Sequence, residues 1–154
     1  MTMKIELMEI LTFMWLLVAF ITWLLTHLKS QKDLKVTNTV NLINNLSTVE
    51  HLLRSDLTVR KAIRKNIDLS PENIDEDLSS ELSVLLDYYE FLSELYDRDV
   101  IDKESIEHLR GGLMLELYEK TKPTIEHWRS DLGRKDLYKK YEELSHKIAS
   151  NNGN

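Results

Sequence analysis

Three Glu-His dipeptides are the residues in this chain whose types and spacing could do chemistry. They are Glu50–His51, Glu107–His108 and Glu126–His127. An imidazole can bind a metal ion, and a carboxylate beside it can orient it or exchange a proton with it. A site formed by the last two pairs would therefore be an acid–base or metal centre, and it requires His108 and His127 to lie on antiparallel neighbouring helices.

The rest of the sequence argues against such a centre. Adjacent positions of a helix point about 100° apart, so the Glu and the His of one pair do not both face one metal ion. No two of the five histidines have the four-residue spacing of a helical zinc site, and HExxH, GxSxG, P-loop and GxGxxG motifs are absent. The chain has no cysteine, which excludes disulfides and thiol catalysis. We therefore expect no enzyme, no cofactor and no metal.

The composition favours an all-α protein. The chain has 154 residues, a net charge of −6, and only 4 glycines and 2 prolines. So little turn chemistry does not suit a fold of many strands, and Leu, Glu, Lys and Ile are common in helices. The negative charge also disfavours nucleic acid as a partner, because that binding depends on neutralising phosphates.

An apolar run predicts one transmembrane helix over residues 10–28. These 19 residues contain no Asp, Glu, Lys or Arg. At 1.5 Å per residue they span roughly 28 Å, which is close to the thickness of the bilayer's hydrocarbon core. Residues 1–9 would be a short extension before it. The expected membrane-anchor residues are Ile10, Trp15, Phe20, Trp23 and Leu28.

A cleaved signal peptide and a buried core helix both fit this run less well than a membrane span. A signal peptide would have a shorter apolar core and a small-x-small cleavage site, and "LTHLKSQ" offers none. A buried core helix rarely has so long an uncharged run in a small domain. Lys4 precedes the span, whereas Lys29, Lys32 and Lys35 follow it. By the positive-inside rule we expect the N-terminus outside and the remaining domain in the cytoplasm.

Residues 29–148 predict a soluble bundle of about five helices, followed by a disordered tail over residues 149–154. Apolar residues at helical spacing begin at Val36, in a helix that either continues from the span or starts near Thr37. Ser55 or Asp56 is expected to cap a second, short helix. Ser70 and Pro71 are expected to open the next one. The basic residues around Lys61 and the acidic section after Pro71 are either solvated faces or, for the basic ones, a contact with anionic lipid.

The second half of the chain predicts further helices with apolar inner faces. Asp102 is the expected cap of one helix, Pro123 the expected start of another, and Gly133 the expected carboxy-terminal cap. The expected inner faces are Leu82, Leu85, Tyr89, Leu92 and Tyr96; Ile106, Leu109, Leu113 and Leu117; Ile125, Trp128 and Leu132; and Leu137, Tyr141, Leu144 and Ile148.

Gly111 and Gly112 stand inside a helical pattern, where each costs about 1 kcal/mol of helix propensity. We interpret the pair as a helix crossing, at which the Tyr89-bearing helix approaches closely. Replacement of Gly112 by Leu should then destabilise the domain.

The order of these segments resembles the family called domain of unknown function 4760 over roughly residues 8–148. The resemblance is carried by "LDYYEFLSELYDRDVID" and by the stretch from the glycine pair to "YEKTKPTIEHWR". It implies a membrane-anchored helical bacterial protein at the inner membrane, and it supplies no catalytic residue.

Three functions are consistent with the sequence. The first is a membrane-tethered interaction or scaffold module, whose partner is a protein or a second copy. The second is a toxin or phage-defence effector that oligomerises in the bilayer. The third is an enzyme with an unrecognised site among Glu107, His108, Glu126 and His127. The absence of site motifs favours the first.

Overall fold

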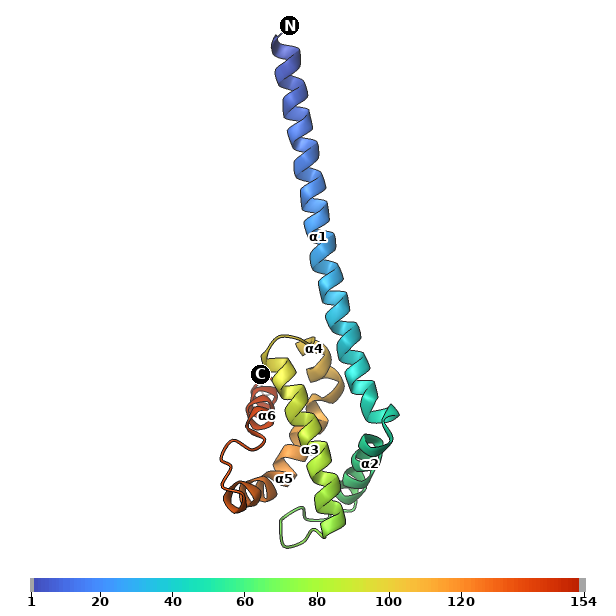
Figure 1. Ribbon diagram of the computed structural model, residues 1–154, viewed down its shortest axis with the longest axis vertical. Helices are drawn as coiled ribbons and strands as arrows, with labels where there is room; N and C mark the ends of the chain where they lie inside the picture. The colour runs from blue at the N-terminus through green and yellow to red at the C-terminus, as the bar shows by residue number, and fades with distance from the viewer. Residues whose placement is uncertain (1, 153–154) are drawn as a thin grey trace.

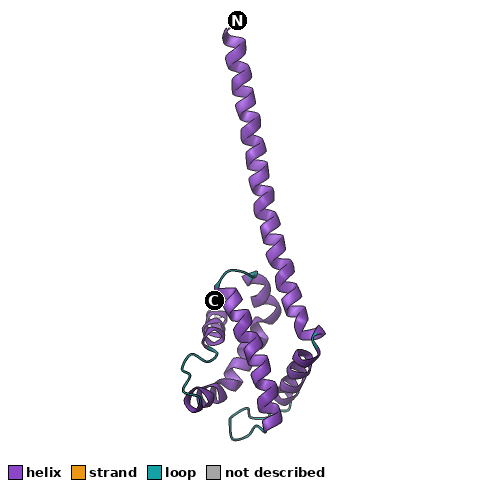
Figure 2. Ribbon diagram, in the orientation of Figure 1, coloured by secondary structure: helices purple, strands orange, loops and turns teal. Residues whose placement is uncertain are grey.

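A computed structural model describes the backbone of residues 2–152 and the side chains of residues 13–151. The elements are α1 (Thr2–Thr48), α2 (Glu50–Arg64), α3 (Glu76–Asp97), α4 (Lys103–Ile106), the π-helical turn η1 (Glu107–Gly111), α5 (Gly112–Asp131) and α6 (Lys139–Asn152). Since α4, η1 and α5 follow one another without a break, they form one rod. The described part of the chain is therefore helices and loops without a strand, which confirms the all-α prediction (Figure 2).

Helix α1 is unbroken over 47 residues, or roughly 70 Å at 1.5 Å per residue. Most of its length stands clear of the other helices, and only its carboxy-terminal part, from Lys35 to Thr48, lies along the bundle (Figure 1). The bundle side of this second part is buried at Thr39, Ile43 and Leu46. The first body helix thus continues from the apolar run and does not start anew near Thr37.

Helix α3 supplies the centre of the core, and the predicted stripe from Leu82 to Tyr96 is confirmed as buried. The Tyr89 ring stacks on Tyr141 of α6 at 5.5 Å between centroids, and Tyr118 of α5 meets Tyr141 edge-on at 5.8 Å. Burial raises the pKa of Tyr89 and of Tyr141, so both hydroxyls stay neutral at ordinary pH. Stacked and edge-on ring pairs of this kind stabilise a packed core.

Two predicted caps are confirmed. The Asp102 carboxylate accepts a hydrogen bond of 2.8 Å from the Ser105 backbone N–H at the start of α4. Gly133 has a φ of +64°, and the next N–H, that of Arg134, donates to the Arg129 carbonyl at 3.0 Å. This is the glycine-terminated helix end that the sequence pattern indicates.

Two other predicted caps are wrong. Helix α2 begins at Glu50, so Ser55 and Asp56 lie inside it and are buried. Both can do so because each is satisfied there: Ser55 donates to Glu81 at 2.6 Å, and Asp56 accepts from Arg60 at 2.8 Å.

The second misplaced cap is at residues 70 and 71, which belong to a turn instead of a helix start. The Ser70 carbonyl accepts from the Asn73 N–H at 3.0 Å within that turn. Helix α3 begins only after Asp75, whose side chain accepts from the Leu78 N–H at 2.8 Å. The N-cap of α3 is therefore Asp75, and not Ser70 followed by Pro71 as the sequence pattern predicted.

Pro123 does not start a helix but lies inside α5. Its ring is exposed, and so is Glu119, the residue whose backbone carbonyl loses its N–H partner. Water can solvate that carbonyl on the outer side, while the buried Thr124 and Ile125 hold the inner side to the core. Leu132, predicted inward, is 60 % exposed at the end of α5.

The π-helical turn η1 changes which residues face inward in the continuous helix formed by α4, η1 and α5. Leu109, predicted as core, is 51 % exposed, whereas Ile106 and Leu117 are buried as predicted and Met114 joins them. A π turn inserts one extra residue per turn, so the stripe moves by one position beyond it.

The predicted disordered tail is also wrong for residues 149–152, because α6 extends to Asn152. The Asn151 side-chain amide donates to Glu107 at 3.3 Å, which ties this last turn to η1.

Candidate functional site

The expected anchor residues lie on the free half of α1. The side chains of Trp15, Phe20, Trp23 and Leu28 are all exposed, Trp15 by 75 %; the side chain of Ile10 lies outside the described side chains. By length and composition, α1 is long and apolar enough to cross a membrane. The hydroxyls of Thr22 and Thr26 donate to carbonyls of their own helix, both at 2.8 Å, so they present no unsatisfied donor to an apolar surrounding.

A polar clasp ties the turn between α3 and α4 to α1, just beyond the apolar run. The Lys35 ammonium pairs with Asp99 at 2.8 Å, and the Asp102 backbone N–H donates to the Thr39 hydroxyl at 2.8 Å. The hydrogen bond from Lys35, followed by its charge, lowers the pKa of Asp99. Lys35 comes seven residues after Leu28, which is about 10 Å along the helix. The clasp therefore holds the bundle directly beneath the end of the apolar run.

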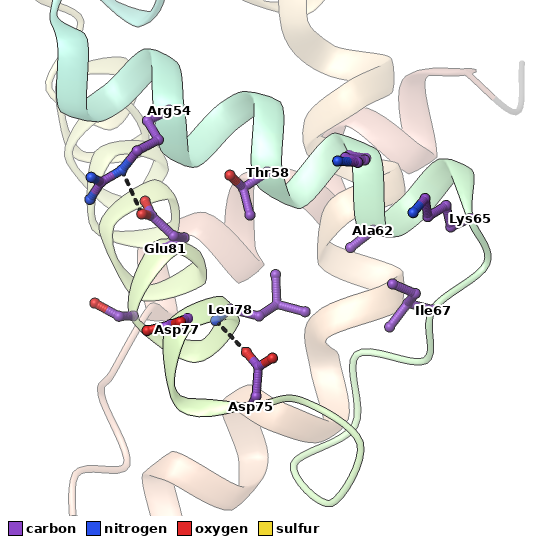
Figure 3. A pocket seen from close by; sticks show the side chains of 11 residues that line it. Arg54, Thr58, Ala62, Lys65, Ile67, Asp75, Asp77, Leu78 and Glu81 are labelled. Carbon is purple, nitrogen blue, oxygen red and sulfur yellow. Dashed lines mark hydrogen bonds and ion pairs between the residues drawn. The ribbon is translucent and has the colours of Figure 1, made fainter.

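An open groove lies at the end of the molecule far from the N-terminus, between α2 and the start of α3 (Figures 1 and 3). Its volume is about 570 Å³. The lining residues are Arg54, Thr58, Lys61, Ala62, Lys65, Ile67, Asp75, Asp77, Leu78, Ser80 and Glu81. Three cations and three carboxylates thus face one small apolar floor.

Three of these six charged side chains already interact within the protein. Arg54 pairs with Glu81 at 2.7 Å, and the Asp75 carboxylate caps α3 (Figure 3). Lys61, Lys65 and Asp77 have no ion-pair partner among the described residues. These three remain available to a ligand that carries both signs of charge.

The structure does not bring the Glu-His pairs together. His108 and His127 lie 19 positions apart on the single rod formed by η1 and α5, which is roughly 28 Å of helix. The antiparallel approach that the metal hypothesis required is therefore wrong, because Pro123 does not separate two helices.

The individual side chains of those pairs also have other roles or none. Glu107 accepts a hydrogen bond from the Tyr96 hydroxyl, and His108, Glu126 and His127 are exposed. Between residues 13 and 151, no three His, Asp or Glu side chains gather where a metal ion could be held.

The glycine pair divides into two unlike positions. A Cβ at Gly111 would lie 3.3 Å from the Ile148 side chain of α6, whereas a Cβ at Gly112 would have nothing within 4 Å. A close approach thus exists at Gly111, but the approaching helix is α6 and not the Tyr89-bearing α3. The crossing does not involve Gly112.

Sequence reasoning missed both the clasp and the groove. Lys35 and Asp99 are 64 residues apart, and each is an ordinary surface residue by type. The groove likewise lies between α2 and α3, and its shape depends on the loop that connects them. The sequence pattern predicted a helix start within that loop, where the structure has a turn. One signal was present, namely the unpaired cations at Lys61 and Lys65 facing an acidic segment.

The extent of the helical unit can now be compared with known proteins. Residues 10–148 match the family described as a domain of unknown function, DUF4760. The chain belongs to the DUF4760 family. The match begins at the first residue of the apolar run and ends inside α6, so the DUF4760 unit comprises both the long helix and the bundle. No curated protein and no solved structure matches the chain.

Proposed function

We propose that this DUF4760 protein is a single-pass membrane tether that holds a protein partner at the cytoplasmic face of a bacterial inner membrane. The observation that carries the proposal is the continuity of α1. Its exposed apolar half leads, without a break, into a half whose inner side belongs to the core. Apolar side chains exposed all round a helix are stable in lipid and costly in water.

The orientation is supported by the lysines that follow the span. Lys29, Lys32 and Lys35 lie within seven residues of its end, against Lys4 alone before it. Lysines at that level favour the cytoplasmic side and the anionic lipid headgroups found there. In this orientation the clasp at Lys35 would hold the bundle close to the membrane, with the groove at its far end.

The membrane-distal groove is the partner site in this proposal. Lys61 and Lys65 of α2 and Asp77 of α3 line it together with Leu78 and Ala62. A groove with both signs of charge and a small apolar floor suits a polypeptide segment with the complementary alternation of charges. The expected partner is therefore a soluble or membrane protein, not nucleic acid.

Membrane insertion and orientation can be tested on the whole chain. We expect the protein to stay with the membranes in alkaline carbonate, which removes peripheral proteins. Since the chain has no cysteine, a single Ser150→Cys variant can report the side on which the bundle lies. An impermeant maleimide should label it only after the cells are opened. Release into carbonate, or labelling of intact spheroplasts, would contradict the proposal.

The groove can be tested with a photo-crosslinking amino acid at Thr58, which lines it. We expect a discrete crosslinked partner in living cells, and its loss in a Lys61→Glu, Lys65→Glu variant. The matched control places the same crosslinker at Glu126, on the exposed outer face of α5. The same crosslinked species from both positions, or none from Thr58, would count against the groove.

A bilayer-perturbing effector is the alternative. The exposed apolar half of α1 favours it, because helices of this kind can assemble in lipid. The described part of the run lacks a charged side chain to line an aqueous path, which favours the tether. Induced expression with a membrane-potential dye separates the two: depolarisation supports the effector, and a steady potential supports the tether.

A further inference from the structure

Helix α1 contains an uncharged stretch outside the apolar run. Charged residues make up 30 % of the chain, yet residues 36–49, "VTNTVNLINNLSTV", contain none. Only one side of this stretch is buried in the bundle. A helix side that faces water normally carries Glu, Lys or Arg, which are both soluble and good helix formers. Here that side carries Asn, Thr and Ser instead, which are poorer helix formers.

The residues on this outer side have coiled-coil spacing. The bundle side of α1 is formed by Lys35, Thr39, Leu42, Ile43 and Leu46. At about 100° per residue, positions 37, 41, 44 and 48 lie opposite this side, and position 34, at the edge of that face, extends them to steps of 3, 4, 3 and 4. These five residues, which we call the outer stripe, are Leu34, Thr37, Asn41, Asn44 and Thr48, and all are exposed. Leu34, the apolar member, is 62 % exposed.

The chemistry of the outer stripe points to a second copy of this chain as its occupant. In a two-fold symmetric contact each residue near the axis meets its own counterpart, so a charge there would repel itself. A neutral carboxamide has both donors and acceptors and can pair with its own kind. Asn41 occupies the position called a in a heptad that starts at Leu34, and a buried Asn at an a position fixes the register of a coiled coil at a cost in stability.

The apolar half of α1 sets the geometry of this contact. Copies that span one membrane in one direction have their α1 helices parallel and at the same depth, which brings position 41 of one copy level with position 41 of the other. The bundles lie on the opposite side of each helix, so they do not obstruct the approach (Figure 1). This step rests on the membrane anchoring proposed above.

We propose that two copies of the chain pair as a parallel, two-fold symmetric dimer through the outer stripe of α1. In the proposed orientation this contact lies on the cytoplasmic side of the membrane spans. It leaves both bundles, and both membrane-distal grooves, facing outward from the dimer axis. A tether built in this way presents two partner sites.

Flanking residues provide an internal control. In this heptad, Asp33 occupies a g position and Asn38 the e position that follows it, so Asp33 of one copy lies beside Asn38 of the other. An Asn-to-Lys change at position 38 would place an ammonium beside a carboxylate. The same change at position 41 would place two ammonium groups against each other.

Disulfide crosslinking in native membranes tests the stripe, because the chain has no cysteine of its own. Full-length variants with one cysteine at Thr37, Asn41 or Asn44 should form crosslinked dimer under mild oxidation, several-fold more than cysteines at the flanking Asn38 or Ser47. A flat profile, a maximum at the flanks, or no crosslink at any of the five would overturn the dimer. A carbonate-resistant chain that does not crosslink would overturn the dimer alone and leave the tether standing.

The charge variants give the second arm, with Thr37→Cys as the reporter. Asn41→Lys should lower the crosslinked fraction about tenfold, since like charges placed opposite each other destabilise an interface. Asn38→Lys should keep it or raise it. Both positions are exposed in the single chain, so the helical circular dichroism should stay unchanged in both. Equal loss in the two variants, or no loss in Asn41→Lys, would overturn the proposed register.

Discussion

The two halves of α1 have the same backbone and opposite surroundings. From Phe13 to Leu28 its large apolar side chains are exposed on every side. From Lys35 to Thr48 the buried apolar side chains, Ile43 and Leu46, turn to the bundle, and Asn residues face outward. The side chains of the first half suit an environment that is apolar on all sides. Those of the second half suit a position with an apolar core on one side and a polar environment on the other.

The difference shows what a hydrophobic pattern reports. Helicity requires only that the residues tolerate the helix, which both halves satisfy. The presence or absence of a period near 3.6 residues reports whether the environment differs from side to side. Four experiments can break or sharpen this comparison, from the largest expected effect to the smallest.

The largest effect is expected from truncating a leucine in the second half. Leu46 is fully buried, so Leu46→Ala should lower the free energy of unfolding of the bundle by about 2–5 kcal/mol. Leu17→Ala, the matched change in the first half, should leave the bundle's thermal midpoint unchanged. Thermal unfolding of the detergent-solubilised protein, followed by circular dichroism, measures both. Equal shifts would show that the two halves do not differ as described.

A charge in the first half should act on membrane insertion and leave the bundle's stability unchanged. Val18→Arg, near the middle of the apolar run, should cost about 3 kcal/mol of insertion free energy. It should increase the fraction of protein released by alkaline carbonate. Ser47→Arg, on the exposed surface of the second half, should release none. If the Val18→Arg protein stayed fully membrane-bound, the span would have to lie elsewhere.

Gly111 and Gly112 offer a similar comparison between a position packed against the core and an adjacent position that is open. Gly111→Leu should destabilise the bundle by about 1–3 kcal/mol, because its side chain would press on Ile148. Gly112→Ala has open space and should stabilise the helix by up to about 1 kcal/mol. Unfolding midpoints of the two variants measure the effect, and a destabilising Gly112→Ala would revive the crossing first expected there.

The smallest effect concerns the cap beside the clasp. Hydrogen bonds from Ser105 lower the pKa of Asp102 below its ordinary value. The folded state thus binds fewer protons than the unfolded state, and the stabilisation is present above the ordinary carboxyl range and lost as pH falls through the folded pKa. Asp102→Asn keeps a capping oxygen but removes the negative charge at the helix N-terminus, so it should cost about 0.3–1 kcal/mol at pH 7. The difference from the parent protein should shrink towards pH 3, and a constant difference would contradict it.

Much of this fold follows from local rules. The apolar run, the stripe of α3 and the caps at Asp102 and Gly133 depend only on composition, spacing and local hydrogen bonds, and the structure has them as expected. The errors arise where distant residues override local preference. Ser55 lies inside a helix because Glu81 accepts a hydrogen bond from its hydroxyl, and Leu109 turns outward because of a π turn that the spacing does not encode.

The candidate sites were less predictable than the fold. The Glu-His pairs attracted attention by residue type, yet their separation depends on whether Pro123 ends a helix. The clasp joins Lys35 to Asp99, two surface-type residues that only the packing of α3 beside α1 brings together. The groove depends on the course of the loop before Asp75, which residue patterns misplaced.

The unbroken course of α1 has a mechanical consequence. With no hinge between the apolar run and the core, a chain anchored as proposed would behave as a lever whose short arm lies in the lipid. From the middle of the run, near residue 19, to Thr48 is roughly 44 Å of helix. A bilayer that changed the tilt of the span by about 10° would swing Thr48 sideways by roughly 8 Å. Because the clasp at Asp99 and Asp102 locks the bundle to the same rod, the whole bundle would travel with it.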